Sequence, residues 1–149
     1  MCKILFQMGE NLKTIVTSCF LSFVSTSISI PSSVEKIGEY FLGNCSDITS
    51  VNVDADNKNY CSVNHSEIIE KDKKRLRFAC RDFVVKTDGK VTTIAVSSLI
   101  SSLTSTILPS SITAVEDWAF YYCNELKDIY YLAGEEEFKK KMPVQITTS

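Results

Sequence analysis

The same long pattern of residue types occurs twice in this chain, and an internal repeat restricts the possible folds more than composition does. Residues 28–53 read ISIPSSVEKIGEYFLGNCSDITSVNV and residues 106–131 read TILPSSITAVEDWAFYYCNELKDIYY. The two segments align without a gap, a Pro-Ser-Ser triplet and one cysteine are identical, and apolar character is kept at nearly every other apolar position. Repeated units predict a fold in which equivalent short elements stack on one another.

The spacing and chemistry of the unit indicate what each part forms. The period from Ile28 to Val51 is 23 residues, within the range of roughly 20–29 that is typical of leucine-rich repeats. An L-x-x-I-x-I run whose end alternates apolar and polar predicts a half-buried strand, which a proline then ends. A following V-x-x-I run predicts a second short element across the stack. The aromatic residues before Cys45 and Cys123 predict one helical or 3₁₀ turn.

Two further segments resemble partial copies of the unit. Residues 6–15 and 91–96 keep the apolar spacing of its strand-forming part, so Ile15 and Ile94 are expected on strands equivalent to that of Val51. The same alignment places Ile28, Val51 and Ile129 on one ladder. It also leaves two units of only 12 or 13 residues, around 18–24 and 97–103. Whether these are true short coils or degenerate ones stays open at this point.

A polar, turn-rich insert separates the two full copies, at about residues 54–90. Within it, short apolar runs at 68–70 and 76–78 flank a basic stretch, which predicts an inserted β-hairpin. The basic stretch, Lys71 to Arg77, contains acidic Asp72 and is interpreted as a solvated hairpin turn.

The C-terminal segment at about 135–142 places three acidic residues before three lysines. Pairs four residues apart and the helix dipole favour this order, so we expect a short terminal helix. Phe138 and Met142 would hold it against the last coil as a cap. The whole chain, 1–149, is therefore expected to form a single repeat domain.

Composition excludes several functional classes. The net charge is −2, so nucleic acid is not an expected partner. The sequence contains no stretch of eighteen or more apolar residues, so no transmembrane helix is predicted. Residues 15–24 imitate the apolar core of a signal peptide, but Glu10 and several hydroxyl residues weaken that interpretation. The cellular location therefore stays open, and the cytoplasm is one possibility.

No motif in the sequence indicates catalysis, a metal or a cofactor. The six cysteines lack CxxC spacing, and Cys45 and Cys123 are expected to be buried free thiols. His65 is the single histidine and lies in the polar insert, without a recognisable partner motif. The pattern Asp54-x-Asp56-x-Lys58 departs from a calcium loop, because lysine replaces the third ligand. An enzyme is therefore the remotest of the functional alternatives.

The motif IPSSVEKIGEYFLGNCSDITSVNV closely resembles the BspA-like (Treponema-type) leucine-rich repeat, whose unit runs roughly I-x-I-P-x-S-V-x-x-I-G-x-x-A-F-x-x-C-x-x-L-x-x-I. The insert and the closing segment 126–142 resemble recurring segments of that family. The chain departs from the pattern at Phe41, where a small residue is usual, and at His65 and Glu116, where glycine is usual. The resemblance implies a leucine-rich-repeat solenoid, a strand-rich α/β right-handed superhelix with an inserted β-hairpin and a short C-terminal helix.

The resemblance also implies a class of function, namely surface or secreted proteins of bacteria and parasitic protists that adhere to or bind host proteins. A protein-binding module with a host or matrix protein as partner is accordingly the expected function. The alternative is a degenerate or structural repeat fragment without a ligand of its own. Solenoids bind partners on extended faces, so the outward strand positions are the predicted contact residues. They are Ser27, Ser29, Ser50, Asn52, Asp128 and Tyr130.

Overall fold

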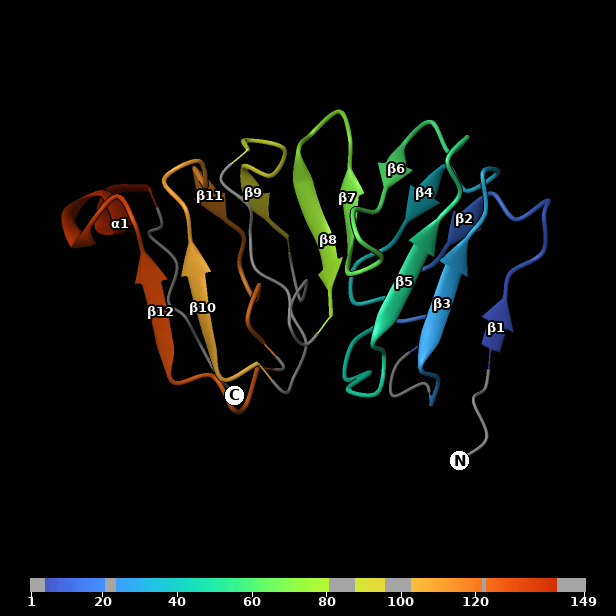
Figure 1. The fold of residues 1–149 in the computed structure, drawn as a ribbon, viewed down its shortest axis with the longest axis horizontal. Helices are drawn as coiled ribbons and strands as arrows, with labels where there is room; N and C mark the ends of the chain where they lie inside the picture. Colours follow the sequence, from blue (N-terminus) through green and yellow to red (C-terminus); the bar gives the residue numbers. More distant parts are fainter. Residues whose placement is uncertain (1–4, 21–23, 81–87, 96–102, 122, 142–149) are drawn as a thin grey trace.

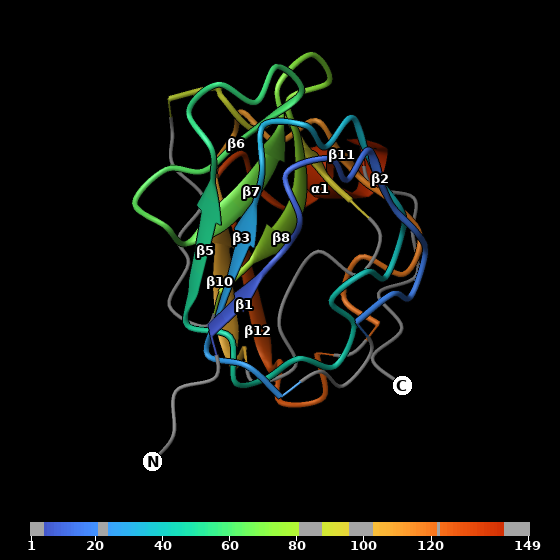
Figure 2. The ribbon, with the colours of Figure 1, turned by 90° about the vertical axis from the view of Figure 1, so that its right-hand side faces the viewer.

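The computed structural model describes residues 5–20, 24–80, 88–95, 103–121 and 123–141. It is a solenoid whose strands lie side by side along the long axis of the molecule and whose helix α1 lies at the C-terminal end (Figure 1). Viewed along the stack, the strands at 5–7, 27–30, 50–53, 105–108 and 128–131 lie on one side, and the two-residue strands at 14–15 and 114–115 lie on the other (Figure 2). The coils outside the insert therefore place strands on two faces.

The first face begins with a three-stranded parallel sheet of β1 (Leu5–Gln7), β3 (Ser27–Ile30) and β5 (Ser50–Val53). Ile28 stands beside Val51 in this sheet, as the repeat alignment predicts. Along β3 and β5, buried residues alternate with more exposed ones, because successive side chains of a strand point to opposite sides.

The second face consists of the short V-x-x-I elements, and it corrects the predicted position of two residues. Strands β2 (Thr14–Ile15) and β4 (Lys36–Ile37) pair in parallel, so Ile15 stands beside Ile37. Likewise Ile94 stands beside Val115. Both residues therefore belong to the second face, and the prediction that they are equivalent to Val51 is wrong.

The coil that begins with β1 is of full length, so the unit expected around residues 18–24 is not a separate short coil. Ser18 donates its N–H to the carbonyl of Glu39, and Phe20 donates to Phe41. Residues 18–20 are thus the counterpart of 40–42 and belong to the turn before the next strand. Residues 39–44 form consecutive hydrogen-bonded turns and no helix, so the helical or 3₁₀ turn expected before Cys45 does not form. The second proposed short unit, 97–103, lies almost entirely outside the described residues.

The insert forms the predicted β-hairpin, which is built into the second face. The five-stranded sheet there has the order β11-β9-β8-β7-β6. Strand β7 pairs antiparallel with β6 and β8, whereas β9 pairs in parallel with β8 and β11. Its strands are β6 (Tyr60–Cys61), β7 (Glu67–Glu70), β8 (Arg75–Ala79), β9 (Thr93–Ile94) and β11 (Ala114–Val115). Residues on both sides of β7 and β8 are buried, as expected of strands covered on both faces.

The hairpin divides the apolar core into two clusters. Ile68 and Phe78 pack with the N-terminal coils, whereas Ile69 and Leu76 pack with the C-terminal coils. The first face is divided as well, because β10 (Ser105–Leu108) and β12 (Asp128–Tyr131) form a separate two-stranded parallel sheet. Ile129 therefore pairs with Thr106 and does not continue the ladder of Ile28 and Val51.

Helix α1 (Glu135–Lys141) forms the predicted cap on the last coil. The Phe138 ring packs edge-on against Tyr131, with ring centroids 5.7 Å apart. Glu135 lies 2.6 Å from Lys139 one turn later, and this bonded lysine lowers the pKa of the Glu135 carboxyl. Met142, the second predicted contact, lies outside the described residues. In the part of the chain that the structure describes, no helix has the length and apolarity to cross a membrane.

The cysteines of the two full copies are buried free thiols, as predicted. Cys45 Sγ lies 2.8 Å from the carbonyl of Phe20, and burial raises the pKa of Cys123 to about 12. Because the thiolate is the form that reacts, we expect iodoacetamide at pH 8 to label exposed Cys19 in the native protein but not Cys45 or Cys123. Peptide mass mapping, with urea-unfolded protein as the control, measures this. Equal labelling of Cys19 and Cys123 in the native state would contradict the packing described.

Candidate binding surfaces

The predicted contact residues of the N-terminal sheet form two adjacent pairs. Ser27 stands beside Ser50, and Ser29 stands beside Asn52, in the parallel register of β3 and β5. All four point away from the core, because they alternate with buried residues, although the three serines are only partly exposed. Asn52 is the one exposed residue of this group.

A polar groove of about 210 Å³ lies where β3 and β5 end. It is lined by Ser29 and Asn52 together with two carboxylates, Glu10 and Asp54. Asp54 already accepts a hydrogen bond from the N–H of Asp56, at 2.9 Å, which fixes the turn after β5. The groove therefore offers hydroxyl, amide and carboxylate groups at one end of this sheet, and the alternation of strand residues alone did not indicate the two carboxylates.

The C-terminal sheet presents an apolar surface. Tyr130 is 57% exposed and stands beside Ile107, which is 46% exposed, in the register of β10 and β12. Leu132 follows β12 and is 62% exposed. Tyr130 and Leu132 also line a hollow of about 400 Å³ between β12 and α1, together with Phe138. We call Ile107, Tyr130 and Leu132 the apolar patch.

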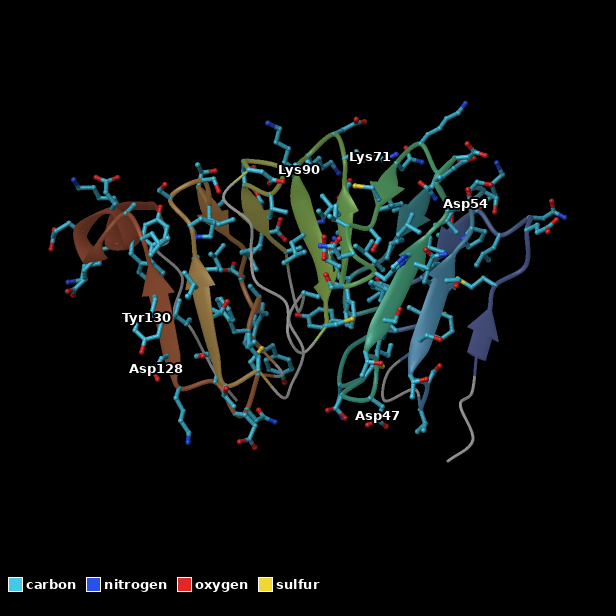
Figure 3. The ribbon with its side chains drawn as sticks, in the orientation of Figure 1. Asp47, Asp54, Lys71, Lys90, Asp128 and Tyr130 are labelled. Atoms are coloured by element: carbon cyan, nitrogen blue, oxygen red, sulfur yellow. The ribbon has the colours of Figure 1, made fainter. Side chains whose placement is uncertain are left out.

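The six predicted contact residues are thus divided between two separate sheets. Figure 3 shows Asp128 and Tyr130 along β12 near one end of the stack, whereas Asp54 and its groove lie near the other. The repeat alignment places the six residues on one face, but it carries no information on how many strands the insert adds between copies. It also missed Ile107, an apolar residue at an outward position of β10, and Leu132, an apolar residue directly after β12.

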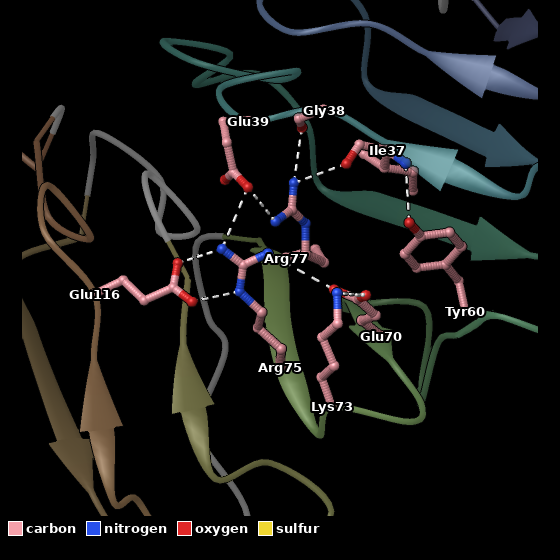
Figure 4. Close-up of polar contacts among 9 residues, drawn as sticks. All are labelled: Ile37, Gly38, Glu39, Tyr60, Glu70, Lys73, Arg75, Arg77 and Glu116. Carbon is pink, nitrogen blue, oxygen red and sulfur yellow. Dashed lines mark hydrogen bonds and ion pairs between the residues drawn. The ribbon is translucent and has the colours of Figure 1, made fainter.

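A charged cluster on β8 joins the coils on either side of the hairpin (Figure 4). Arg75 forms two hydrogen bonds to Glu116, which follows β11, and one of 3.2 Å to Glu39, which follows β4. Burial alone lowers the pKa of Arg75, but its hydrogen bond to Glu116 and the charge of Glu39 outweigh burial and raise that pKa.

Arg77 continues this cluster deeper into the stack. It is buried and binds the same Glu39 carboxylate at 2.9 Å. The interpretation of 71–77 as a solvated turn is therefore wrong for Arg75 and Arg77, although the three lysines of this stretch are exposed. We call Glu39, Arg75, Arg77 and Glu116 the charged cluster.

Among the residues that the structure describes, no three His, Cys, Asp or Glu side chains lie together as they would to hold a metal ion. His65 is exposed at the turn before β7, where its backbone carbonyl accepts a hydrogen bond from Val51.

Comparison with known proteins agrees with this architecture. The family model described as "BspA type Leucine rich repeat region" matches residues 3–68 and 85–142, in six copies. No curated protein sequence matches the chain. The unmatched interval between the two segments contains β8, with Arg75 and Arg77.

Solved structures share the fold at low sequence identity. The pneumococcal vaccine antigen PcpA is 21% identical with a TM-score of 0.69, and the match covers 80% of this chain and 31% of PcpA. A leucine-rich repeat protein from Eubacterium ventriosum is 17% identical (TM-score 0.64; 87% and 42% covered). A leucine rich cell surface protein from Faecalibacterium prausnitzii is 19% identical (0.62; 85% and 41%). The chain spans less than half the length of each of these proteins.

Proposed function

Because the chain belongs to the family of BspA-type leucine-rich-repeat proteins, we propose that it is a protein-binding repeat module that contacts its partner through the apolar patch. The observation that carries this proposal is the clustering of Ile107, Tyr130 and Leu132 at the outward side of one small sheet. Contiguous exposed apolar side chains on a soluble protein mark interaction sites more often than scattered ones do.

The chemistry of the patch suits a protein partner. Tyrosine at the centre of an interface combines a large apolar ring with a hydroxyl that can form a hydrogen bond, and few side chains contribute as much to affinity. Ile107 beside it and Leu132 after it extend the apolar contact, and the hollow between β12 and α1 can receive a protruding side chain. The exposed Asp128, which begins β12, supplies a polar rim.

The partner we propose is an extracellular protein, of a host or of the surrounding matrix, and the location we propose is the cell surface. The support is the nature of two structural neighbours, one a vaccine antigen and one a cell surface protein. The second mode we propose is adhesion through Ser27, Ser29, Ser50 and Asn52, and it is favoured by the polar groove that Ser29 and Asn52 line.

The test measures binding to a panel of purified matrix and serum proteins by biolayer interferometry. For a partner that binds the wild type, we expect Tyr130→Ala to raise Kd by about tenfold or more, as truncation of a central interface aromatic does. We expect Leu132→Ala to raise it by a smaller factor. Val16→Ala is the matched control, because Val16 is equally exposed on the turn after β2, and it should leave Kd unchanged.

The other outcomes each identify an alternative. If Asn52→Ala weakens binding while Tyr130→Ala does not, the polar end of the N-terminal sheet is the contact surface and the apolar patch is not. If no protein of the panel binds, the proposal fails in favour of a structural repeat fragment without a ligand of its own.

A further inference from the structure

A shallow hollow of about 350 Å³, largely open to solvent, lies at the joint between the coils that precede the hairpin and those that follow it. Among the described residues, it is lined by three aromatic side chains, Tyr40, Trp118 and Tyr121, and by Ser18. The Tyr40 and Tyr121 rings meet at 86° with centroids 6.4 Å apart, and Trp118 meets Tyr121 at 84° and 5.2 Å. Rings at right angles thus form adjacent sides of this open hollow, which we call the aromatic cage.

Three of the four described lining residues hold the same place in their respective repeat units. The hydrogen bond from Ser18 to Glu39 places Ser18 level with Tyr40, and the alignment places Tyr40 level with Trp118. All three have positive φ, between 54° and 62°. Glycine or asparagine fits that left-handed backbone better than an aromatic residue does. The chain therefore carries large rings where the backbone alone favours small residues, and such strained positions concentrate at functional sites.

The chemistry of the lining selects a class of ligand. A sugar or a peptide backbone needs several hydrogen-bonding groups, and among the described lining residues only the Ser18 and tyrosine hydroxyls could supply any. A quaternary ammonium group needs none, and it is attracted by the negative faces of surrounding aromatic rings. Asp117 is exposed directly beside Trp118 in the chain and adds a negative charge at this side of the molecule.

We propose that the aromatic cage binds a trimethylammonium group, carried either by a small molecule or by a methylated lysine side chain. This site is distinct from the apolar patch and uses none of its residues. Half of the Trp118 side chain is exposed, so the group can enter from solvent without unfolding the coil. The site needs both parts of the stack, because Tyr40 belongs to the coils before the hairpin and Trp118 and Tyr121 belong to the coils after it.

The first experiment uses the unmodified protein and its own reporter. Trp118 is the single tryptophan of the chain, so its fluorescence reports on the cage directly. We expect tetramethylammonium chloride to change the emission saturably, with sodium chloride as the ionic-strength control. tert-Butanol has nearly the same shape without the charge and should cause no saturable change. Equal effects of the two compounds, or no saturation with tetramethylammonium, would overturn the proposal.

A pair of variants then distinguishes the contribution of the aromatic ring to binding from that of side-chain volume. Tyr40→Phe keeps the aromatic face and should change Kd by less than about twofold, whereas Tyr40→Leu removes it and should weaken binding by about tenfold. Val24→Leu, at an exposed residue outside both the cage and the apolar patch, is the control and should have no effect. Unchanged binding by folded Tyr40→Leu contradicts the proposal. If that variant does not fold, the comparison of tetramethylammonium with tert-butanol decides alone.

A last comparison distinguishes the sources of the group. Choline and a trimethyl-lysine peptide are titrated separately, with the unmethylated peptide as reference. Tighter binding of the methylated peptide than of choline identifies a protein side chain as the source, and the reverse identifies a small molecule. Equal binding of methylated and unmethylated peptides, with no binding of choline, would exclude the cage as a trimethylammonium site.

Discussion

Replacing Arg77 with alanine is expected to lower the free energy of unfolding by about 2–4 kcal/mol, because each buried acceptor left without a donor costs about 1–3 kcal/mol, whereas the ion pair with the partly exposed Glu39 adds little. The Arg77 side chain is only 2% exposed and binds the Glu39 carboxylate at 2.9 Å. Its second terminal nitrogen donates to the carbonyls of Ile37 and Gly38, at 3.0 and 2.8 Å. The alanine variant would leave these acceptors without their donor. Urea-induced unfolding followed by circular dichroism measures the change.

Lys73→Ala provides the matched control on the same hairpin. Lys73 is 68% exposed and forms one ion pair with Glu70, so its loss should cost less than about 0.5 kcal/mol. Arg77→Lys retains the charge but loses the planar fork that reaches both the carboxylate and the carbonyls, so we expect an intermediate loss. A midpoint for Arg77→Ala within error of that for Lys73→Ala would show that the charged cluster does not hold the coils together.

The charged cluster also explains one departure from the family pattern. At Gly38 a side chain is impossible without movement, because an added Cβ would lie 2.3 Å from the backbone nitrogen of Thr17 in the preceding coil. The equivalent position in the later copy is Glu116, and its carboxylate binds Arg75 from the hairpin. Arg75 lies in the interval that the family model does not match. The unusual glutamate and the inserted strand are therefore parts of one interaction.

The repeat predicted the main elements of the fold because the order of apolar and polar residues determines which side chains can be buried. Alternation of apolar and polar residues fixes which side chains of β3, β5, β10 and β12 face the core, and the insert between two apolar runs indicates the hairpin. The partial copies were assigned to the wrong face for an equally physical reason. The two faces use the same apolar-x-x-apolar spacing, so Leu12 and Ile15 fit either one when the rest of the unit diverges.

The candidate surfaces were predicted less completely than the fold. Alternation indicates that Tyr130 points outward, but the neighbours that make it part of a patch depend on strand pairing across the stack. Similarly, the charge of residues 71–77 does not reveal that β8 lies inside the stack with both sides covered. The aromatic cage was beyond prediction, because it needs Tyr40 and Tyr121 to meet across an insert of unknown geometry.

Replacement of Asn57 is the other change with a large expected effect. Asn57 is 1% exposed, and its amide makes four hydrogen bonds. The Nδ2 group donates to the carbonyls of Pro31 and Val34, at 2.9 and 3.0 Å, and Oδ1 accepts from the N–H groups of Asn59 and Tyr60. The side chain thus ties the start of the insert to the preceding coil, next to the point where the Tyr60 hydroxyl accepts a hydrogen bond from Ile37 (Figure 4).

Asn57→Ala is expected to destabilise the protein by about 3 kcal/mol or more, because each buried group left without a partner costs about 1–3 kcal/mol. Asn57→Asp is the sharper test at pH 7. It preserves the shape and the Oδ1 acceptor but turns a carboxylate oxygen towards two carbonyl oxygens, so it should be no more stable than the alanine variant. Asn52→Asp, on the exposed side of β5, serves as the control and should change stability by less than about 0.5 kcal/mol. Wild-type stability of Asn57→Asp in urea unfolding would mean that donation to Pro31 and Val34 does not anchor the insert.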